Sequence, residues 1–157
     1  MTKYIAVIGP AVCSSAERDD AYKIGEMLAA RESVLICGGG SGVMEAAAQG
    51  AHSANGVVIG ILPGNDHTAG NPFLTYAIAS GLGEARNAII ARTADTLIAV
   101  GGEYGTLSEI ALAMKMGKKV ILLNSWQLQP ARPADRIPLI AHSAAEAVEI
   151  AIGRHSS

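Results

Sequence analysis

Short runs of β-branched and other apolar residues alternate along this 157-residue chain with alanine-rich stretches of helical spacing. Strands are predicted at 4–8, 33–37, 57–62, 74–78, 96–100 and 119–123. Helices are predicted from residue 14 to about 30 and at 43–54, 83–93, 106–116 and 143–152. Alternation of strands and helices is typical of α/β folds. We therefore expect one doubly wound, mostly parallel sheet with helices on both faces.

The chain shows no internal repeat and no linker, so residues 1–157 are expected to form a single domain. The segment 124–138 holds three prolines and the only tryptophan, which predicts an irregular surface loop. Residues 153–157 follow the last predicted helix and are expected to form a frayed tail.

The low charge of the chain limits its possible partners. Only 17% of the residues are charged, the formal net charge is −2, and no run of Lys or Arg occurs, so we expect no nucleic-acid partner. No apolar stretch approaches the roughly 18 residues of a membrane-spanning helix, and the N-terminus lacks a signal-peptide pattern; we expect no membrane association. Two cysteines are too few for a disulfide framework, which predicts a cytoplasmic protein with free thiols.

Three segments that follow predicted strands, 9–14, 38–43 and 101–106, begin with glycine, and the last two are glycine-rich. In a doubly wound sheet these segments share one edge, where ligands bind at the point of strand-order reversal. Glycines let main-chain amides approach a ligand, and a following helix N-terminus favours an anion, although glycines also serve tight turns alone. Two such loops at one edge favour a phosphate-bearing ligand. The candidate binding residues are Gly9, Gly39, Gly40, Ser41, Gly42, Gly101, Gly102, Tyr104, Gly105 and Thr106.

Several other chemistries lack their sequence patterns. The P-loop pattern GxxxxGK[ST] is absent, which disfavours a standard ATPase or GTPase. The first glycine-rich loop has Val43 at the sixth position of the dinucleotide fingerprint, and no acidic residue ends the next strand at Leu62. The four histidines have no metal-ligand spacing, so no metal site is expected. No GxSxG elbow of a serine hydrolase occurs.

The stretch 83–109 combines arginines on a predicted helix with a glutamate after a glycine loop. Arg86 could hold a phosphate or carboxylate through two parallel hydrogen bonds. Glu109 could stabilise an oxocarbenium-like transition state or activate water. The spacing leaves alternatives open: Thr106 and Glu109 also fit a helix capping box, Arg86 could form a surface ion pair, and Arg92 lies on the same helix.

These residues resemble the motifs of the LOG-like superfamily, whose members are often labelled lysine decarboxylases. The segment 105–109 matches the GTxxE part of its PGGxGTxxE motif, and 38–44 resembles its GGGxxGLM motif with one residue fewer between the glycines. The resemblance spans about residues 4–124 and implies a Rossmann-like fold with oligomers built on a helix-packed dimer. We expect a homodimer or homotetramer, and Leu112 and Met116 offer an apolar surface for it.

Within that superfamily, the segments 61–64, 81–87 and 99–101 resemble molybdenum cofactor carrier proteins. This resemblance implies that the glycine loops hold a phosphorylated small molecule, either the molybdenum cofactor, which is a pterin, or a nucleotide. Other members are phosphoribohydrolases, which cleave the N-glycosidic bond of a nucleoside 5′-monophosphate, such as AMP or a cytokinin riboside monophosphate, to free base and ribose 5-phosphate. For that activity, Arg86 would be the catalytic arginine and Glu109 the catalytic carboxylate.

Three residues depart from the phosphoribohydrolase motifs. Gly101 stands in place of a proline, Glu103 in place of the second glycine, and Asn87 in place of a lysine. The negative charge of Glu103 would repel a phosphate, and Asn87 lacks the positive charge of the lysine that would attract one. The sequence therefore favours binding over hydrolysis, with an interaction module carrying a vestigial pocket as a third hypothesis.

Overall fold

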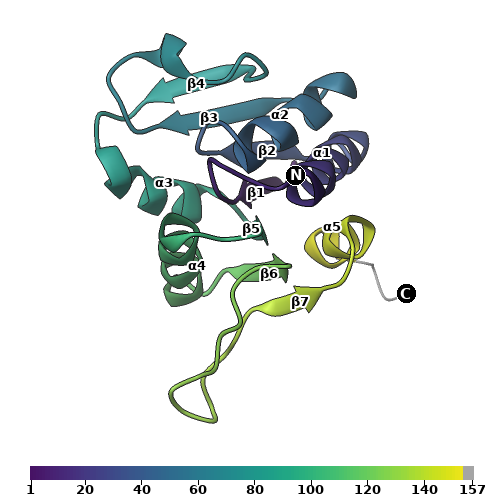
Figure 1. Ribbon diagram of the computed structural model, residues 1–157, viewed down its shortest axis with the longest axis vertical. Helices are drawn as coiled ribbons and strands as arrows, with labels where there is room; N and C mark the ends of the chain where they lie inside the picture. The colour runs from purple at the N-terminus through teal and green to yellow at the C-terminus, as the bar shows by residue number, and fades with distance from the viewer. Residues whose placement is uncertain (154–157) are drawn as a thin grey trace.

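The computed structural model describes residues 1–153 and places seven strands in one sheet of order β4-β3-β2-β1-β5-β6-β7 (Figure 1). The strands are β1 (Tyr4–Ile8), β2 (Val34–Cys37), β3 (Val58–Leu62), β4 (Tyr76–Ala79), β5 (Thr96–Val100), β6 (Lys119–Leu123) and β7 (Leu139–Ala141). The helices are α1 (Ser15–Ala30), α2 (Val43–Ser53), α3 (Arg86–Thr93), α4 (Tyr104–Lys115) and α5 (Ala144–Ile152), with 3₁₀ turns η1 (His67–Ala69) and η2 (Gly83–Ala85). All six strand pairings are parallel, which confirms the predicted α/β sheet. Most of the predicted tail, residues 154–157, lies outside the described residues.

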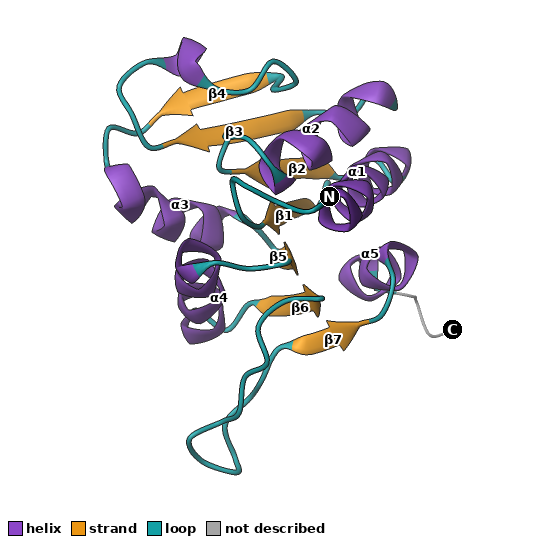
Figure 2. Cartoon of the chain, viewed as in Figure 1, coloured by secondary structure: helices purple, strands orange, loops and turns teal. Residues whose placement is uncertain are grey.

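Helices cover both faces of the sheet, as predicted. Figures 1 and 2 show α1, α2 and α5 on one face and α3 and α4 on the other. Successive side chains of β1 alternate between two buried apolar clusters, with Val7 in the first and Ala6 and Ile8 in the second. Burial on both faces is the usual state of parallel strands, and it leaves the strand ends as the place where polar main-chain groups can meet a ligand.

Three element boundaries differ from the prediction by two residues or more. The helix predicted at 83–93 begins as the 3₁₀ turn η2, and α4 begins at Tyr104, two residues earlier than predicted. The fourth strand covers Tyr76–Ala79 rather than 74–78. Leu74 instead packs on β3, where a Cβ built on Gly60 would lie 2.6 Å from the Leu74 Cδ1 atom. Regular pairing of β4 therefore starts only after Leu74.

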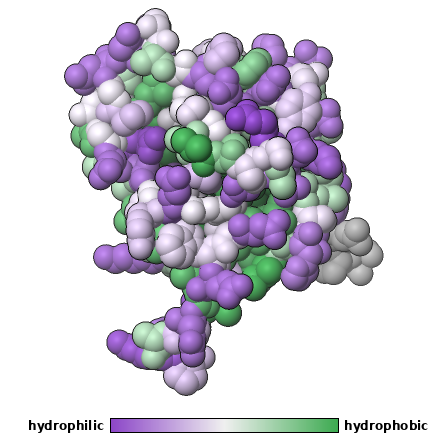
Figure 3. All heavy atoms as spheres, in the orientation of Figure 1, coloured by the Kyte–Doolittle hydropathy of each residue, from purple (hydrophilic) through white to green (hydrophobic). Residues whose placement is uncertain are grey.

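The sequence analysis missed β7, which pairs with β6 at the edge of the sheet. A strand of three residues, Leu139–Ala141, is too short to produce an alternating pattern. The segment 124–138 before it is irregular, as predicted. This loop projects from the body of the molecule and is largely hydrophilic (Figure 3). Within residues 1–153, no helix combines the length and apolar character needed to cross a membrane.

Candidate functional site

The strand order reverses between β1 and β5, and a cleft opens beside this point at the carboxyl ends of the strands. The cleft has two adjoining chambers of about 170 and 410 Å³, which share Ala11, Met44 and Arg86. The smaller chamber is also lined by Gly9, Pro10, Asn87, Glu103, Gly105, Thr106 and Glu109. The larger chamber is also lined by Gly38, Gly39, Gly40, Ser41, Leu62, Pro63, Gly64, Asp66 and Ala69.

Most of the predicted site residues lie in this cleft. Residues from the loop after β1, the glycine loop after β2 and the start of α4 all contribute, as the switch-point argument expects. Two hydrogen bonds join the first two loops: the Ser41 hydroxyl donates to the Ala11 carbonyl at 3.0 Å, and the Val43 amide donates to the Pro10 carbonyl at 3.1 Å. Gly42 lies at this junction, where a Cβ would come within 2.3 Å of the Pro10 carbonyl oxygen.

Four predicted site residues line neither chamber: Gly42 lies at the loop junction, and the other three lie elsewhere. Gly101 and Gly102 line a separate hollow together with Trp126, and the exposed Tyr104 ring packs against Trp126 with ring centroids 5.5 Å apart. Gly101 has a φ of +65°, and a Cβ there would lie 1.7 Å from Glu17 Oε2. A tight turn and close contact with α1 therefore account for this glycine, which is the alternative that the sequence left open.

The helices that open on the cleft lack the side-chain caps of other helices. Ser14 caps α1 in a complete capping box, and the Ser143 hydroxyl accepts from the third amide of α5. By contrast, the N-cap residues of α2 and α4, Gly42 and Glu103, form no side-chain cap. The capping box predicted for residues 106–109 is wrong, because α4 begins before Thr106 and buries that residue in its first turn.

Main-chain donors are left available in the cleft. Among the described residues, no acceptor pairs with the amides of Gly40 and Ser41, or with those of Gly105 and Thr106 in the first turn of α4. An uncapped helix N-terminus carries partial positive charge. These donors together suit an anion at the cleft.

Arg86 lies where the two chambers meet. Its Nε donates to the Ile61 carbonyl at 3.0 Å, its Nη2 to the Gly38 carbonyl at 3.4 Å, and its Nη1 to Asn87 Oδ1. These acceptors lie at or just beyond the ends of β3 and β2 and on α3, so the guanidinium ties three elements together. Gly38 leaves room for this guanidinium, because a Cβ there would lie 2.7 Å from the Arg86 Nη2 atom. Arg86 forms no ion pair among the described residues, unlike Arg31, which pairs with Glu149.

Glu109 is buried in the smaller chamber, and burial raises its pKa from 4.5 to about 7. The nearby Arg86 guanidinium opposes this rise by favouring the carboxylate. The Asn87 amide donates to the Ser108 hydroxyl at 3.1 Å, and that hydroxyl donates to the Gly105 carbonyl at 2.7 Å. The chamber therefore holds a carboxyl group that can exchange a proton near neutral pH beside a fixed arginine.

A family model covers nearly the whole chain. The model of the SLOG cluster4 family matches residues 2–150. The chain belongs to the SLOG cluster4 family. This membership confirms the resemblance to the LOG-like superfamily that the glycine motifs predicted.

Sequence relatives of this SLOG protein include uncharacterised and enzymatic proteins. An uncharacterised protein of Archaeoglobus fulgidus is 49% identical over 119 residues, which cover 76% of this chain and 78% of that protein. The cytokinin riboside 5′-monophosphate phosphoribohydrolase LOG of Oryza sativa subsp. japonica is 36% identical over 108 residues. That match covers 62% of this chain but only 44% of the rice enzyme.

Solved structures similar to this SLOG protein include molybdenum cofactor proteins. The molybdenum cofactor binding protein of Rippkaea orientalis superposes with a TM-score of 0.88 at 38% identity, over 96% of this chain and 95% of that chain. The molybdenum cofactor carrier protein of Chlamydomonas reinhardtii superposes with a TM-score of 0.83 at 30% identity, over 96% of both chains. The predicted resemblance to the carrier branch is therefore confirmed.

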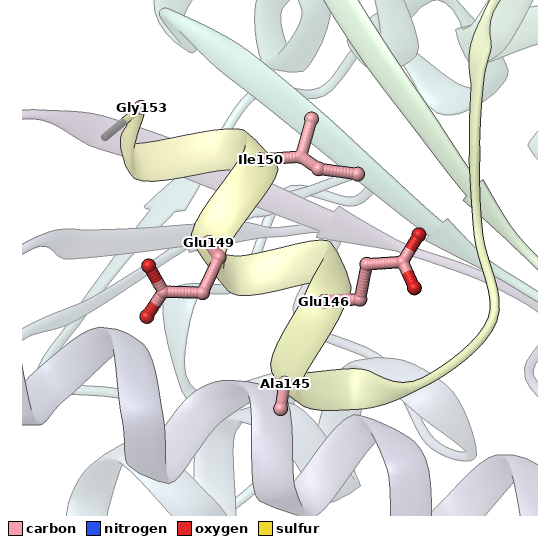
Figure 4. Close-up of a pocket in the computed structure, with 5 residues that line it drawn as sticks. All are labelled: Ala145, Glu146, Glu149, Ile150 and Gly153. Atoms are coloured by element: carbon pink, nitrogen blue, oxygen red, sulfur yellow. The ribbon is translucent and has the colours of Figure 1, made fainter. Parts of the chain in front are cut away.

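A hollow of about 560 Å³, larger than either chamber of the cleft, lies over α5 (Figure 4). It is lined by Ala145, Glu146, Glu149, Ile150 and Gly153. The figure shows two carboxylates on this helix, and none of the described residues that line the hollow is basic. Glu149 is paired with Arg31, and the described lining offers no basic side chain of its own to an anion, so size alone does not identify the site of this SLOG protein.

The sequence analysis missed several residues that shape the cleft. Met44 lines both chambers, and Asn71 hydrogen-bonds the carbonyls of Gly39 and Gly40. Asn71 lies in a loop that gave no motif, although its position before a proline marked a turn. Asn87 was identified only as a departure from a motif, since its bond to Arg86 depends on the fold.

The raised pKa of Glu109 predicts a pH dependence of stability. Between about pH 4.5 and 7 the native state keeps the Glu109 proton while the unfolded chain has lost it, so the free energy of unfolding falls as pH rises. The full effect is on the order of 3 kcal/mol. In urea unfolding at pH 5 and pH 8, Glu109→Gln should not show this fall in the free energy of unfolding. Relative to wild type, the variant should therefore be more stable at pH 8 than at pH 5. The exposed Glu26→Gln on α1 is the control; equal pH slopes for wild type and Glu109→Gln would contradict the assignment.

Proposed function

We propose that this protein binds a phosphorylated small molecule in the cleft and acts as a carrier. The ligand is either the molybdenum cofactor, which is a phosphorylated pterin, or a nucleotide. The observation that carries the proposal is the meeting of the uncapped N-termini of α2 and α4 with Arg86 at one cleft. Anions bind at such helix N-termini, and an arginine adds charged donors. The molybdenum cofactor proteins that share this fold at 30% to 38% identity support the choice of ligand.

The charges of the cleft favour binding through neutral main-chain donors. Its lining includes one basic residue, Arg86, and three acidic ones, Asp66, Glu103 and Glu109. A phosphate would accept hydrogen bonds from the free amides and from the guanidinium hydrogens that Arg86 does not donate to carbonyls. A site with this balance gains little long-range attraction for a dianion, which suits a carrier that must also release its ligand.

Bound pterin tests the carrier proposal. Protein purified anaerobically from a cofactor-producing host, then oxidised, should release a fluorescent pterin. Arg86→Ala should retain at least about tenfold less pterin than wild type, because charged hydrogen bonds contribute about 1.5–3 kcal/mol. Arg92→Ala is the matched control, since Arg92 is an exposed arginine on the same helix.

Absence of pterin from wild-type protein, together with no uptake of added cofactor, would reject this ligand. A protein with a vestigial pocket would also show no rise in Tm with any nucleotide or pterin, because only ligands of the native state stabilise it.

A second candidate function is hydrolysis of a nucleoside 5′-monophosphate. It is favoured by the buried Glu109, whose pKa of about 7 would let it accept and donate a proton beside Arg86. The 36% identity to the rice phosphoribohydrolase supports it over the part of that enzyme that aligns.

Incubation with AMP and N6-modified AMP tests the hydrolase proposal. If the protein is a hydrolase, wild type should release free base, and Glu109→Gln should lower the rate by at least about 100-fold, since an acid–base group contributes 10²–10⁴-fold. Arg92→Ala should retain wild-type activity. No release by wild type would reject hydrolysis of these substrates, and undiminished release by Glu109→Gln would reject the role of Glu109.

We also propose that the protein works as a homodimer or homotetramer. Leu112 on α4 and Met116, the C-cap residue of that helix, are half-buried against the core on the α3–α4 face of the sheet, which leaves part of each side chain for a second copy. Light scattering at micromolar concentration should give the mass of a dimer or tetramer, and Leu112→Lys should shift it toward the monomer. A monomeric wild type would refute this proposal.

A further inference from the structure

Asn71 fastens the loop between β3 and β4 onto the glycine loop after β2. Its main-chain amide donates to the Gly39 carbonyl at 2.8 Å, and its Nδ2 donates to the Gly40 carbonyl at 3.0 Å. Its Oδ1 accepts from the Phe73 amide at 3.0 Å. The side chain is therefore held at both ends, and this network fixes which terminal atom is oxygen and which is nitrogen.

These bonds determine which way the next amides point. The described chain contains no cis peptide bond, and in a trans peptide the N–H is directed opposite to the C=O. Since the carbonyls of Gly39 and Gly40 are directed at Asn71, the N–H groups of Gly40 and Ser41 are directed away from it. Both residues line the larger chamber, and neither amide has an acceptor among residues 1–153.

The glycine loop needs such a restraint. Gly39 has a φ of +76°, and a Cβ there would lie 2.1 Å from the Leu62 Cδ2 atom, so only glycine fits. Glycine also has the widest conformational freedom, so ordering a glycine loop on ligand binding costs conformational entropy. A loop that is already held in its binding conformation avoids part of that cost.

We propose that Asn71 is a positioning residue that presents the amides of Gly40 and Ser41 to an anionic oxygen of the ligand. The proposal rests on the proposed function and deepens it, because it names the donors of the larger chamber and the residue that aims them. Asn71 lies 31 residues after Gly40 in the sequence, and it does not itself line the cleft.

Two variants separate the parts of this clamp. Asn71→Asp keeps an oxygen for the Phe73 amide but turns the donor to Gly40 into a second acceptor, which would repel the Gly40 carbonyl. Asn71→Ala removes both side-chain bonds. Thr75→Val is the matched control, because it removes a hydrogen bond in the same segment that goes to β3: the Thr75 Oγ1 atom accepts from the Val58 amide.

Calorimetric titration with inorganic phosphate and with AMP provides the test. Both Asn71 variants should bind five- to tenfold more weakly than wild type, which corresponds to the loss of about one net hydrogen bond, whereas Thr75→Val should bind like wild type. In wild-type ¹⁵N–¹H spectra, phosphate should shift the Gly40 and Ser41 amides, and this response should be reduced in Asn71→Asp. Thermal melting of each variant identifies any loss that comes from unfolding.

The outcomes distinguish this inference from the function beneath it. If wild type binds neither probe, the proposed function fails and the inference fails with it. If wild type binds and the folded Asn71 variants bind equally well, only the role of Asn71 is overturned. If phosphate shifts other cleft amides but not those of Gly40 and Ser41, the inference is again overturned, even where a variant does not fold.

Discussion

The guanidinium of Arg86 holds the candidate site together. It donates to main-chain carbonyls at Ile61 and Gly38, where two neighbouring strands end, and to Asn87 on its own helix. Gly38 lies just beyond β2, and Ile61 lies within β3 but past the last β2–β3 pair, Cys37 with Gly60, so their carbonyls need partners outside that ladder. By donating hydrogen bonds to these carbonyls, Arg86 fixes the wall between the two chambers. Some of its N–H groups remain available for a ligand. The cleft is therefore organised before any ligand arrives.

The polarity of the cleft follows from this arrangement. Main-chain amides supply donors at the glycine loop and at the first turn of α4, while acidic side chains limit the net attraction for an anion. Glu109 adds a carboxyl group with a pKa of about 7 in the same chamber. Binding and proton transfer are both chemically available here, and relatives of both kinds occur. The balance of charge is the physical reason to place binding first.

Periodicity predicted the elements that are long and buried on both faces, such as β1 and β5, because burial demands continuous apolar runs. It failed for β7, whose three residues follow a proline-containing loop, and it placed β4 too early because Leu74 packs on Gly60. The residues at 106–109 matched a capping box by spacing alone. Where a helix starts also depends on the turn before it, and here the left-handed Gly101 lets the chain enter α4 early.

The sequence by itself determined the fold class and the edge of the sheet that carries the loops, because these depend on residue type and local order. Spacing left Arg86 and Glu109 among alternatives, and the resemblance to the LOG-like superfamily singled them out. Only the tertiary structure decided that Gly101 and Gly102 face a different hollow, that Arg86 pairs with carbonyls rather than with a carboxylate, and that Asn71 clamps the glycine loop. These are contacts between segments far apart in the chain. No local pattern encodes them, since they form only when the packed sheet brings the loops together.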